Sequence, residues 1–233
     1  MCGRYVYEAK EEDLKREFAA TVDKVNLDFT RPRYNVAPSQ YVPAIRTLEA
    51  ERTVGAMRWG LIPSWSKDDK IANHTINARA ESVAEKPAFR AAFKQRRCLI
   101  PASGFYEWQR AANGKGAKQP FYFFMKDKPV FGFAGLWEEW TEPETGDVIE
   151  SCTIITTEAN AVLAPVHDRM PVILKPADYE EWLDARIKDA EKLKHLLAPY
   201  PAHKMSSHAV SRQVNSPKFD AAELINPLEL NSK

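Results

Sequence analysis

The chain has 233 residues, of which 44% are hydrophobic and 28% charged, enough apolar material for one large core or two small ones. Its formal net charge of +1 excludes binding of polyanions by overall charge, so a nucleic-acid site would need a local cluster of Lys and Arg. No apolar run reaches the roughly 20 residues of a membrane helix, and the charged residues among the first twenty exclude the apolar core of a secretory signal. We therefore expect a cytoplasmic protein, or a nuclear one in a eukaryote.

The N-terminal half of the sequence predicts two helices and two strands. Apolar residues spaced four apart, with ion pairs beside them, predict an amphipathic helix over residues 10–20. Residues 41–48 and 52–59 predict two strands that flank a polar turn. Pro87, a residue favoured in the first helical turn, begins a second predicted helix over residues 87–97.

The second half predicts short strands followed by helices. Runs of aromatic and β-branched residues predict strands at 98–100, 105–108, 121–125, 130–136 and 152–157. An Asn-Gly turn at 113–116 predicts a hairpin between the second and third of these strands. The acidic segment 138–150 is expected to be a surface loop. Helices are expected at 176–186 and 188–198.

These elements indicate a single domain over residues 1–233, without an internal repeat. Many short strands with interspersed helices predict an α+β fold with an open or barrel-like sheet of mixed or antiparallel strands, dressed with helices. The three cysteines are odd in number and far apart, which favours free thiols in a reducing compartment over a disulfide framework. With His203 and His208 they do not show the ligand spacing of a zinc site, so no metal is expected.

Cys2 directly follows the initiator methionine. Cysteine is small enough for an aminopeptidase to remove Met1, which leaves an α-amine and a thiol on adjacent carbons. The ordinary pKa values of these groups are about 8 and about 8.5, so both are partly deprotonated near neutral pH. The amine can condense with an aldehyde, and the thiolate can close on the same carbon to a thiazolidine, which an internal cysteine cannot form. The plainer alternative is a frayed terminus without function.

Three further polar residues could support chemistry, each with a plainer alternative. Glu107 lies between two aromatic residues in a predicted strand, where burial would raise its pKa as a general acid or base requires. An edge strand would instead leave this carboxylate in water. His167 precedes an apolar strand and could transfer protons near neutral pH, or be a surface residue. Asn77 could donate its amide to a developing oxyanion, or form a turn.

Six motifs occur along the chain in a fixed order: Cys-Gly-Arg from residue 2, Tyr-Asn-Val-Ala-Pro from 34, Arg-Trp-Gly-Leu-Ile-Pro from 58, Ile-Asn-Ala-Arg-Ala-Glu from 76, Phe-Tyr-Glu-Trp from 105 and His-Asp-Arg-Met-Pro from 167. With the closing segments 210–215 and 222–225, they cover essentially the whole chain. In these motifs and their order the sequence resembles the SOS-response-associated peptidase family, the abasic-site processing proteins.

The resemblance implies a single α+β domain with a barrel-like core and a positively charged channel that leads to Cys2. It implies that the protein captures abasic sites in single-stranded DNA as a stable covalent crosslink, with neither a metal nor an organic cofactor. A monomer is the default expectation. The family's name reflects a proposed autocatalytic removal of Met1, although an ordinary aminopeptidase would serve equally well.

The same resemblance implies catalytic roles for four residues. Cys2 forms an imine and then the thiazolidine with the opened sugar. Glu107 matches the family's catalytic carboxylate and would assist ring opening, while His167 would protonate the sugar oxygen and take part in elimination or crosslink reversal. Asn77 matches an asparagine that holds the opened sugar. If the thiol does not close, the imine activates β-elimination of the 3′ phosphate, which is abasic-site lyase chemistry.

DNA-binding residues are also implied by the resemblance. Arg4 and Arg79 match arginines that hold phosphates beside the lesion. Asn35 and the turn with Pro38 and Ser39 would approach the DNA backbone.

Trp65 and Trp108 are expected to stack on bases, since stacking is worth roughly 1–3 kcal/mol per base and ignores sequence. For each tryptophan, core packing is the plainer alternative. Lys86 stands where some bacterial relatives carry an arginine; it supplies a point charge but not a bidentate phosphate contact.

Two other classes remain open from the sequence. An N-terminal Cys-Gly followed by an arginine also begins glutamine amidotransferases of the N-terminal-nucleophile group, where the thiol attacks an amide and the α-amine is the base. Their other motifs do not fit here. A noncatalytic single-strand binding module is the other alternative, and it would leave Cys2 without a role.

Overall fold

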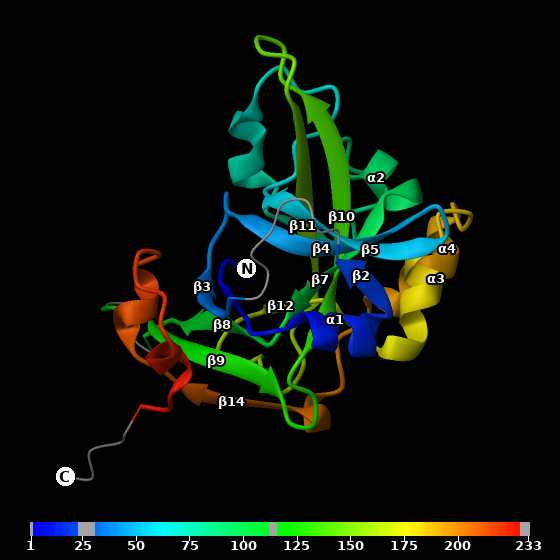
Figure 1. Cartoon of the computed structure of the whole chain (residues 1–233). Coiled ribbons are helices and arrows are strands. Elements are labelled where there is room, and N and C mark those ends of the chain that lie inside the picture. The colour runs from blue at the N-terminus through cyan, green and yellow to red at the C-terminus, as the bar shows by residue number, and fades with distance from the viewer. Residues whose placement is uncertain (1, 23–30, 112–115, 229–233) are drawn as a thin grey trace, which may run out of the picture.

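The computed structural model describes residues 2–22, 31–111 and 116–228. Its helices are short and lie outside the strands (Figure 1). The α-helices are α1 (Glu11–Phe18), α2 (Arg90–Gln95), α3 (Tyr179–Leu183) and α4 (Ala190–Leu193). The 3₁₀ segments are η1 (Asp69–His74), η2 (Pro176–Asp178), η3 (Lys194–Leu197), η4 (Ala202–Lys204), η5 (Arg212–Asn215) and η6 (Ala222–Ile225). Within the described ranges, no helix is long and apolar enough to span a membrane.

Five strands close into a barrel, which are β4 (Tyr41–Leu48), β5 (Glu51–Trp59), β7 (Arg97–Ala102), β10 (Phe131–Thr141) and β11 (Val148–Glu158). Around the barrel the strands follow the order β5, β4, β7, β10, β11, and each pairs antiparallel with the next. Parallel pairing of β11 with β5 closes the ring, with Cys152 opposite Trp59. The expected α+β fold with a barrel-like core of mixed strands is confirmed.

Four short strands extend the barrel wall. They are β2 (Ala20–Val22) parallel to β5, β6 (Asn77–Arg79) parallel to β11, β12 (Arg169–Pro171) antiparallel to β11, and β13 (Ile173–Leu174) antiparallel to β10. Of these, β6 and β12 bring residues from distant parts of the sequence to the end of β11. The site described below uses both of these strands.

A second, antiparallel sheet carries the start of the chain. Its order is β14 (Met205–Ala209), β9 (Gln119–Met125), β8 (Gly104–Gln109), β1 (Tyr5–Tyr7) and β3 (Arg33–Val36). All three residues of β1 are buried. The Tyr5 ring packs on Trp59 and Phe133 of the barrel, with ring centroids 5.4 and 5.9 Å apart. Edge-to-face packing of this kind fastens β1 to the barrel core.

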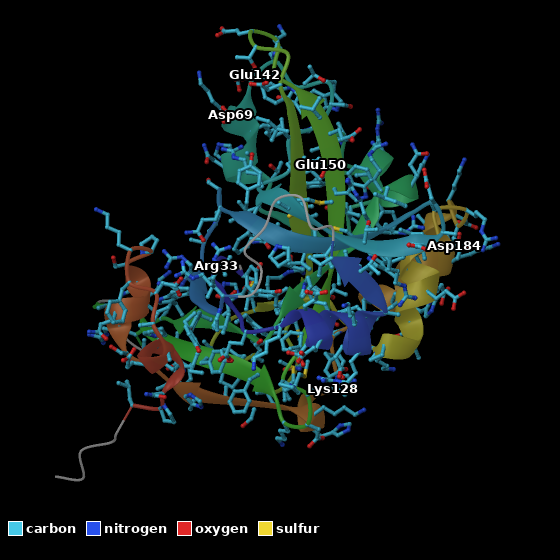
Figure 2. All side chains as sticks on the ribbon, viewed as in Figure 1. Arg33, Asp69, Lys128, Glu142, Glu150 and Asp184 are labelled. Atoms are coloured by element: carbon cyan, nitrogen blue, oxygen red, sulfur yellow. The ribbon has the colours of Figure 1, made fainter. Side chains whose placement is uncertain are left out.

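Segment 138–150 is mostly strand, so the expected surface loop is wrong. β10 continues to residue 141, with Glu138 and Trp140 buried and their neighbours more exposed. This alternation is the period of two of a strand, and the acidic composition of the segment conceals it. The Glu138 carboxylate lies 2.7 Å from the Arg96 guanidinium, so its burial is compensated. Only the outer tip is a turn, where Figure 2 shows Glu142.

The expected helices are present but shorter than predicted. The segment at 87–97 forms a helix only over α2, because residue 97 already begins the barrel strand β7. The helices expected at 176–186 and 188–198 each combine a 3₁₀ turn with a short α-helix. Most of the turn at 113–116 lies outside the described residues, yet β8 and β9 pair antiparallel up to Gln109 and Gln119, as the predicted hairpin requires.

Gly60 provides a test of the barrel closure. Its φ of +129° is one that L-residues rarely adopt, and a Cβ there would lie 2.7 Å from the carbonyl oxygen of Ala72. We expect Gly60→Ala to lower the free energy of unfolding by about 1–3 kcal/mol. Gly55→Ala is the matched control, because nothing lies within 4 Å of its added Cβ. Denaturant unfolding of both variants checks this, and equal effects would contradict it.

Candidate functional site

Cys2 lies just before β1, beside the second sheet and the end of β6. The residue has no exposed surface, and its carbonyl oxygen accepts a hydrogen bond of 2.8 Å from the side-chain amide of Asn77. Burial raises the pKa of the Cys2 thiol well above its ordinary value, and the nearby Glu107 carboxylate raises it further. In this environment the thiol is protonated at neutral pH and needs a base to become a nucleophile. All three cysteines are free thiols and buried.

Glu107 lies in β8, the neighbour of β1. Tyr5 pairs with Phe105, and the same antiparallel register continued by two residues sets Gly3 opposite Glu107. Glu107 is only 2% exposed, and burial raises its pKa to about 7. Its burial between aromatic neighbours is confirmed, and an edge strand is excluded because β9 pairs with the other side of β8. A carboxyl group that titrates near neutral pH can both accept and donate a proton.

His167 lies in the loop between β11 and β12. Its Nδ1 accepts a hydrogen bond of 3.0 Å from the backbone N–H of Arg169 and lies 3.0 Å from a carboxylate oxygen of Asp168. Partial burial lowers the pKa of His167, although Asp168 opposes this effect. In the neutral ring the proton is therefore on Nε2, which can donate to a substrate. The loop is fastened to β8 by a 3.0 Å hydrogen bond from Gln109 to the carbonyl of Pro165.

β6 contributes Asn77 and Arg79. Residues two apart on a strand share a face, so the exposed Arg79 lies on the same face as Asn77. The Asn77 amide nitrogen is engaged by Cys2, whereas its Oδ1 is buried and has no hydrogen-bond partner among the described residues. An amide with one free buried oxygen can accept a hydrogen bond from a bound substrate.

Arg4 and Asn35 form a buried network with the C-terminal part of the chain. Arg4 donates to Asn35 Oδ1 at 2.9 Å and to the carbonyl of Val214 at 2.7 Å. Asn35 is 1% exposed, and its amide donates to the carbonyls of Ser216 and Phe219 at 2.9 and 2.7 Å. In this structure Asn35 therefore holds the C-terminal segment and orients Arg4. Direct contact of Asn35 with DNA stays a prediction.

Asn215 connects this network to Trp108. Its Oδ1 accepts a 2.7 Å hydrogen bond from the indole N–H of Trp108, and its carbonyl accepts one of 3.4 Å from Arg4. Trp108 is half-buried, so one part of the ring packs in the fold and another faces solvent. No role was expected for Asn215, because it lies far along the chain from both residues that it holds.

The other residues expected to bind DNA lie nearer the surface. Ser39 is exposed at a φ of 71°, and its N–H donates to the carbonyl of Trp59 at 2.8 Å, which fixes the turn that also contains the half-buried Pro38. Trp65 is 60% exposed, and Lys86 is exposed as well. In the described part of the chain, none of these side chains takes part in the hydrogen bonds around Cys2. Their roles stay predictions.

A cavity of about 780 Å³ opens beside His167. His167 and Trp108 lie in its wall, so it adjoins the strand that carries Glu107. Its other walls contain Arg110, Lys118 and Arg212, cationic residues for which no site role was expected. In the described ranges, no group of three or more His, Cys, Asp or Glu could hold a metal ion.

The sequence matches the family "SOS response associated peptidase (SRAP)" over residues 1–217. The chain belongs to the SRAP family. "Abasic site processing protein YoqW" of Bacillus subtilis (strain 168) is 43% identical over 225 residues, which are 97% of this chain and 99% of that protein. "Abasic site processing protein HMCES" of Pongo abelii is 32% identical over 85% of this chain and 66% of its own length.

Solved structures show the same SRAP fold. A protein from Bacteroides thetaiotaomicron aligns with a TM-score of 0.86 at 28% identity and covers 97% of this chain. A protein from Bordetella bronchiseptica aligns with a TM-score of 0.75 at 30% identity and covers 90% of this chain. In the structure described here, the SRAP motifs that contain Cys2, Asn77 and Glu107 meet where β1, β6 and β8 lie together.

The raised pKa of Glu107 makes stability depend on pH. The ordinary pKa is 4.5 and the folded one about 7, so the folded protein binds more protons than the unfolded chain between these values. Stability contributed by this group therefore falls as pH rises through this window. Because Gln cannot ionise, the effect of Glu107→Gln on stability should be more favourable at pH 8 than at pH 5, by about 2–3 kcal/mol.

Thermal unfolding of both proteins at the two pH values measures this difference. Glu138→Gln is a control, since it also neutralises a buried carboxylate but removes the ion pair with Arg96. It should lower stability at pH 8. A pH-independent effect of Glu107→Gln would contradict the expectation.

Proposed function

We propose that this protein captures abasic sites in single-stranded DNA through Cys2, as a thiazolidine crosslink that forms after Met1 is removed. The observation that carries the proposal is the proximity of Cys2 to Glu107, whose buried carboxyl group has a pKa of about 7. A proton acceptor of this strength is what a buried, protonated thiol needs. The names of the SRAP relatives, abasic site processing proteins, support the same substrate.

The chemistry balances with water as the only further reactant. Hydrolysis of the first peptide bond releases Met1 and frees the Cys2 amine. The closed sugar opens when Glu107 takes the proton of its C1′ hydroxyl while the ring oxygen is protonated. The amine then adds to the C1′ aldehyde and water leaves, which gives an imine. The thiol adds to the imine carbon and its proton passes to nitrogen, which closes the thiazolidine.

His167 and Asn77 serve the sugar rather than the thiol. The neutral His167 ring can protonate the sugar oxygen from Nε2, and it can take part in β-elimination from the imine or in reversal of the crosslink. The free Oδ1 of Asn77 accepts a hydrogen bond from a hydroxyl of the opened sugar.

DNA binding rests on placed cations and exposed aromatic rings. Arg4 and Arg79 hold phosphates beside the lesion, and Trp65 and Trp108 stack on neighbouring bases. Lys86 and the turn at Pro38 and Ser39 add backbone contacts. Because stacking needs unpaired bases, single-stranded DNA is the preferred partner.

Replacement of Cys2 tests the crosslink. Cys2→Ala should abolish the heat-stable adduct with an abasic oligonucleotide while the amine still forms an imine that borohydride traps. Cys2→Ser should also fail, since an oxazolidine hydrolyses readily. Intact-mass measurement before and after mixing reports both Met1 loss and the adduct. Wild-type yield with Cys2→Ala would exclude the mechanism, and ammonia release from glutamine would favour an amidohydrolase instead.

Replacement of Glu107 and replacement of His167 should affect different steps of the reaction. Loss of a general acid or base typically costs about 10²–10⁴-fold, so Glu107→Gln should slow crosslinking by this factor with little change in noncovalent affinity. His167→Ala should slow crosslinking less, yet suppress strand cleavage and crosslink reversal. Single-turnover rates from pH 5.5 to 8.5 measure both. The reverse ranking of the two variants would assign ring opening to His167.

A further inference from the structure

The cavity beside His167 has a cationic wall that the chemistry at Cys2 does not use. Its lining comes from three separate segments, which are the facing ends of β8 and β9, the loop before β12, and η5. Each segment contributes charged residues. Arg110 and Lys118 lie at the ends of β8 and β9, Asp168 lies in the loop, and Arg212 lies in η5. Three cations thus surround a cavity whose single acidic residue, among the described lining residues, is Asp168.

The three cations are available to a ligand. Each is exposed, and none forms an ion pair with a carboxylate in the described part of the chain. Asp168, the one acidic residue among the described lining residues, lies 3.0 Å from His167 Nδ1 and is largely exposed. Arg110 faces the same histidine closely enough that its positive charge contributes to the lowered pKa of His167. An anion in the cavity would therefore meet positive charge on several sides.

The cavity shares one residue, His167, with the proposed reaction centre. His167, which is proposed to protonate the sugar oxygen, lines the cavity together with Trp108 and the cationic residues. A volume of about 780 Å³ lies in the range of sites that hold ligands of nucleotide size or larger. A nucleotide attached to a sugar at the reaction centre could therefore extend into it.

We propose that this cavity is a phosphate-binding subsite for the DNA strand next to the abasic sugar, with Arg110, Lys118 and Arg212 as its ligands. The inference rests on the proposed function. It assigns a binding site to the phosphate that lies next to the abasic sugar and takes no part in the chemistry at Cys2. The phosphate is either a phosphodiester of the continuing strand or the phosphomonoester end that β-elimination leaves. Both present oxygens that guanidinium and ammonium groups bind through charge-assisted hydrogen bonds.

The test combines a triple variant with truncated substrates. Arg110→Gln, Lys118→Gln and Arg212→Gln together remove the cationic wall. The control is Lys94→Gln, Lys188→Gln and Lys192→Gln, three exposed lysines on the side of α2 and α4, whereas Figure 1 shows the C-terminal segment with η5 at the opposite side of the molecule. Crosslinking rates at subsaturating DNA are measured with abasic oligonucleotides that carry zero to three nucleotides on either side of the lesion.

For the wild type, added nucleotides on one side should speed crosslinking, and the triple variant should lose about 10–100-fold of that gain. With a strand that ends at the lesion on that side, the two proteins should react equally. Affinity for an oligonucleotide with a tetrahydrofuran abasic analogue should show a log–log salt slope shallower by about 2 in the triple variant, since each lost single-strand phosphate contact removes about 0.7. The control variant should behave as wild type in every assay.

A terminal phosphate at the truncated end distinguishes the two sources. If the terminal phosphate speeds crosslinking as much as added nucleotides do, the subsite holds the phosphomonoester of a cleaved end. If only added nucleotides speed crosslinking, the subsite holds an internal phosphodiester. An equal gain in the triple variant and the wild type would overturn the subsite while wild-type crosslinking still supports the proposed function. If the wild type crosslinks none of these substrates, the proposed function itself fails.

Discussion

The pairing of β1 with β8 is the constraint on which the site depends. β1 has only three residues, and its place is secured by backbone hydrogen bonds on both sides and by the Tyr5 ring against the barrel. The antiparallel register then brings the start of the chain opposite Glu107. The same packing removes water from both groups, so the carboxyl pKa rises to about 7 and the thiol stays protonated. One pairing thus positions Cys2 and buries the carboxyl group beside it.

The C-terminal segment completes the site from the other end of the sequence. The carbonyls of Val214 and Asn215 accept hydrogen bonds from Arg4, and the Asn215 side chain holds Trp108. A guanidinium group bound in this way keeps one orientation, so less entropy is lost when it meets a phosphate. With a net charge of only +1, the DNA binding proposed above would depend on such placed cations rather than on an overall field.

The site lowers the stability of the fold that carries it. Glu107 is buried with a strongly raised pKa, and the Asn77 Oδ1 is buried without a hydrogen-bond partner among the described residues. Glu138, in contrast, is a buried carboxylate with the Arg96 guanidinium at 2.7 Å. Both glutamates are buried, and for Glu107 burial raises the pKa to about 7. Polar groups held in this way are typical of functional sites rather than of structural cores.

The sequence by itself determined the features that depend on neighbouring residues. Aromatic and β-branched runs predicted β7, β8 and β9, and the aromatic neighbours of Glu107 predicted its burial. Only the tertiary structure decided the parallel closure of β11 on β5, the long acidic hairpin, and the engagement of Asn35 by distant carbonyls. β1 and β6 are three residues long, too short for a periodic pattern, so long-range pairing alone creates them. Side-chain periodicity reports which face of a segment is buried, whereas hydrogen bonds and packing between distant segments decide what that face meets.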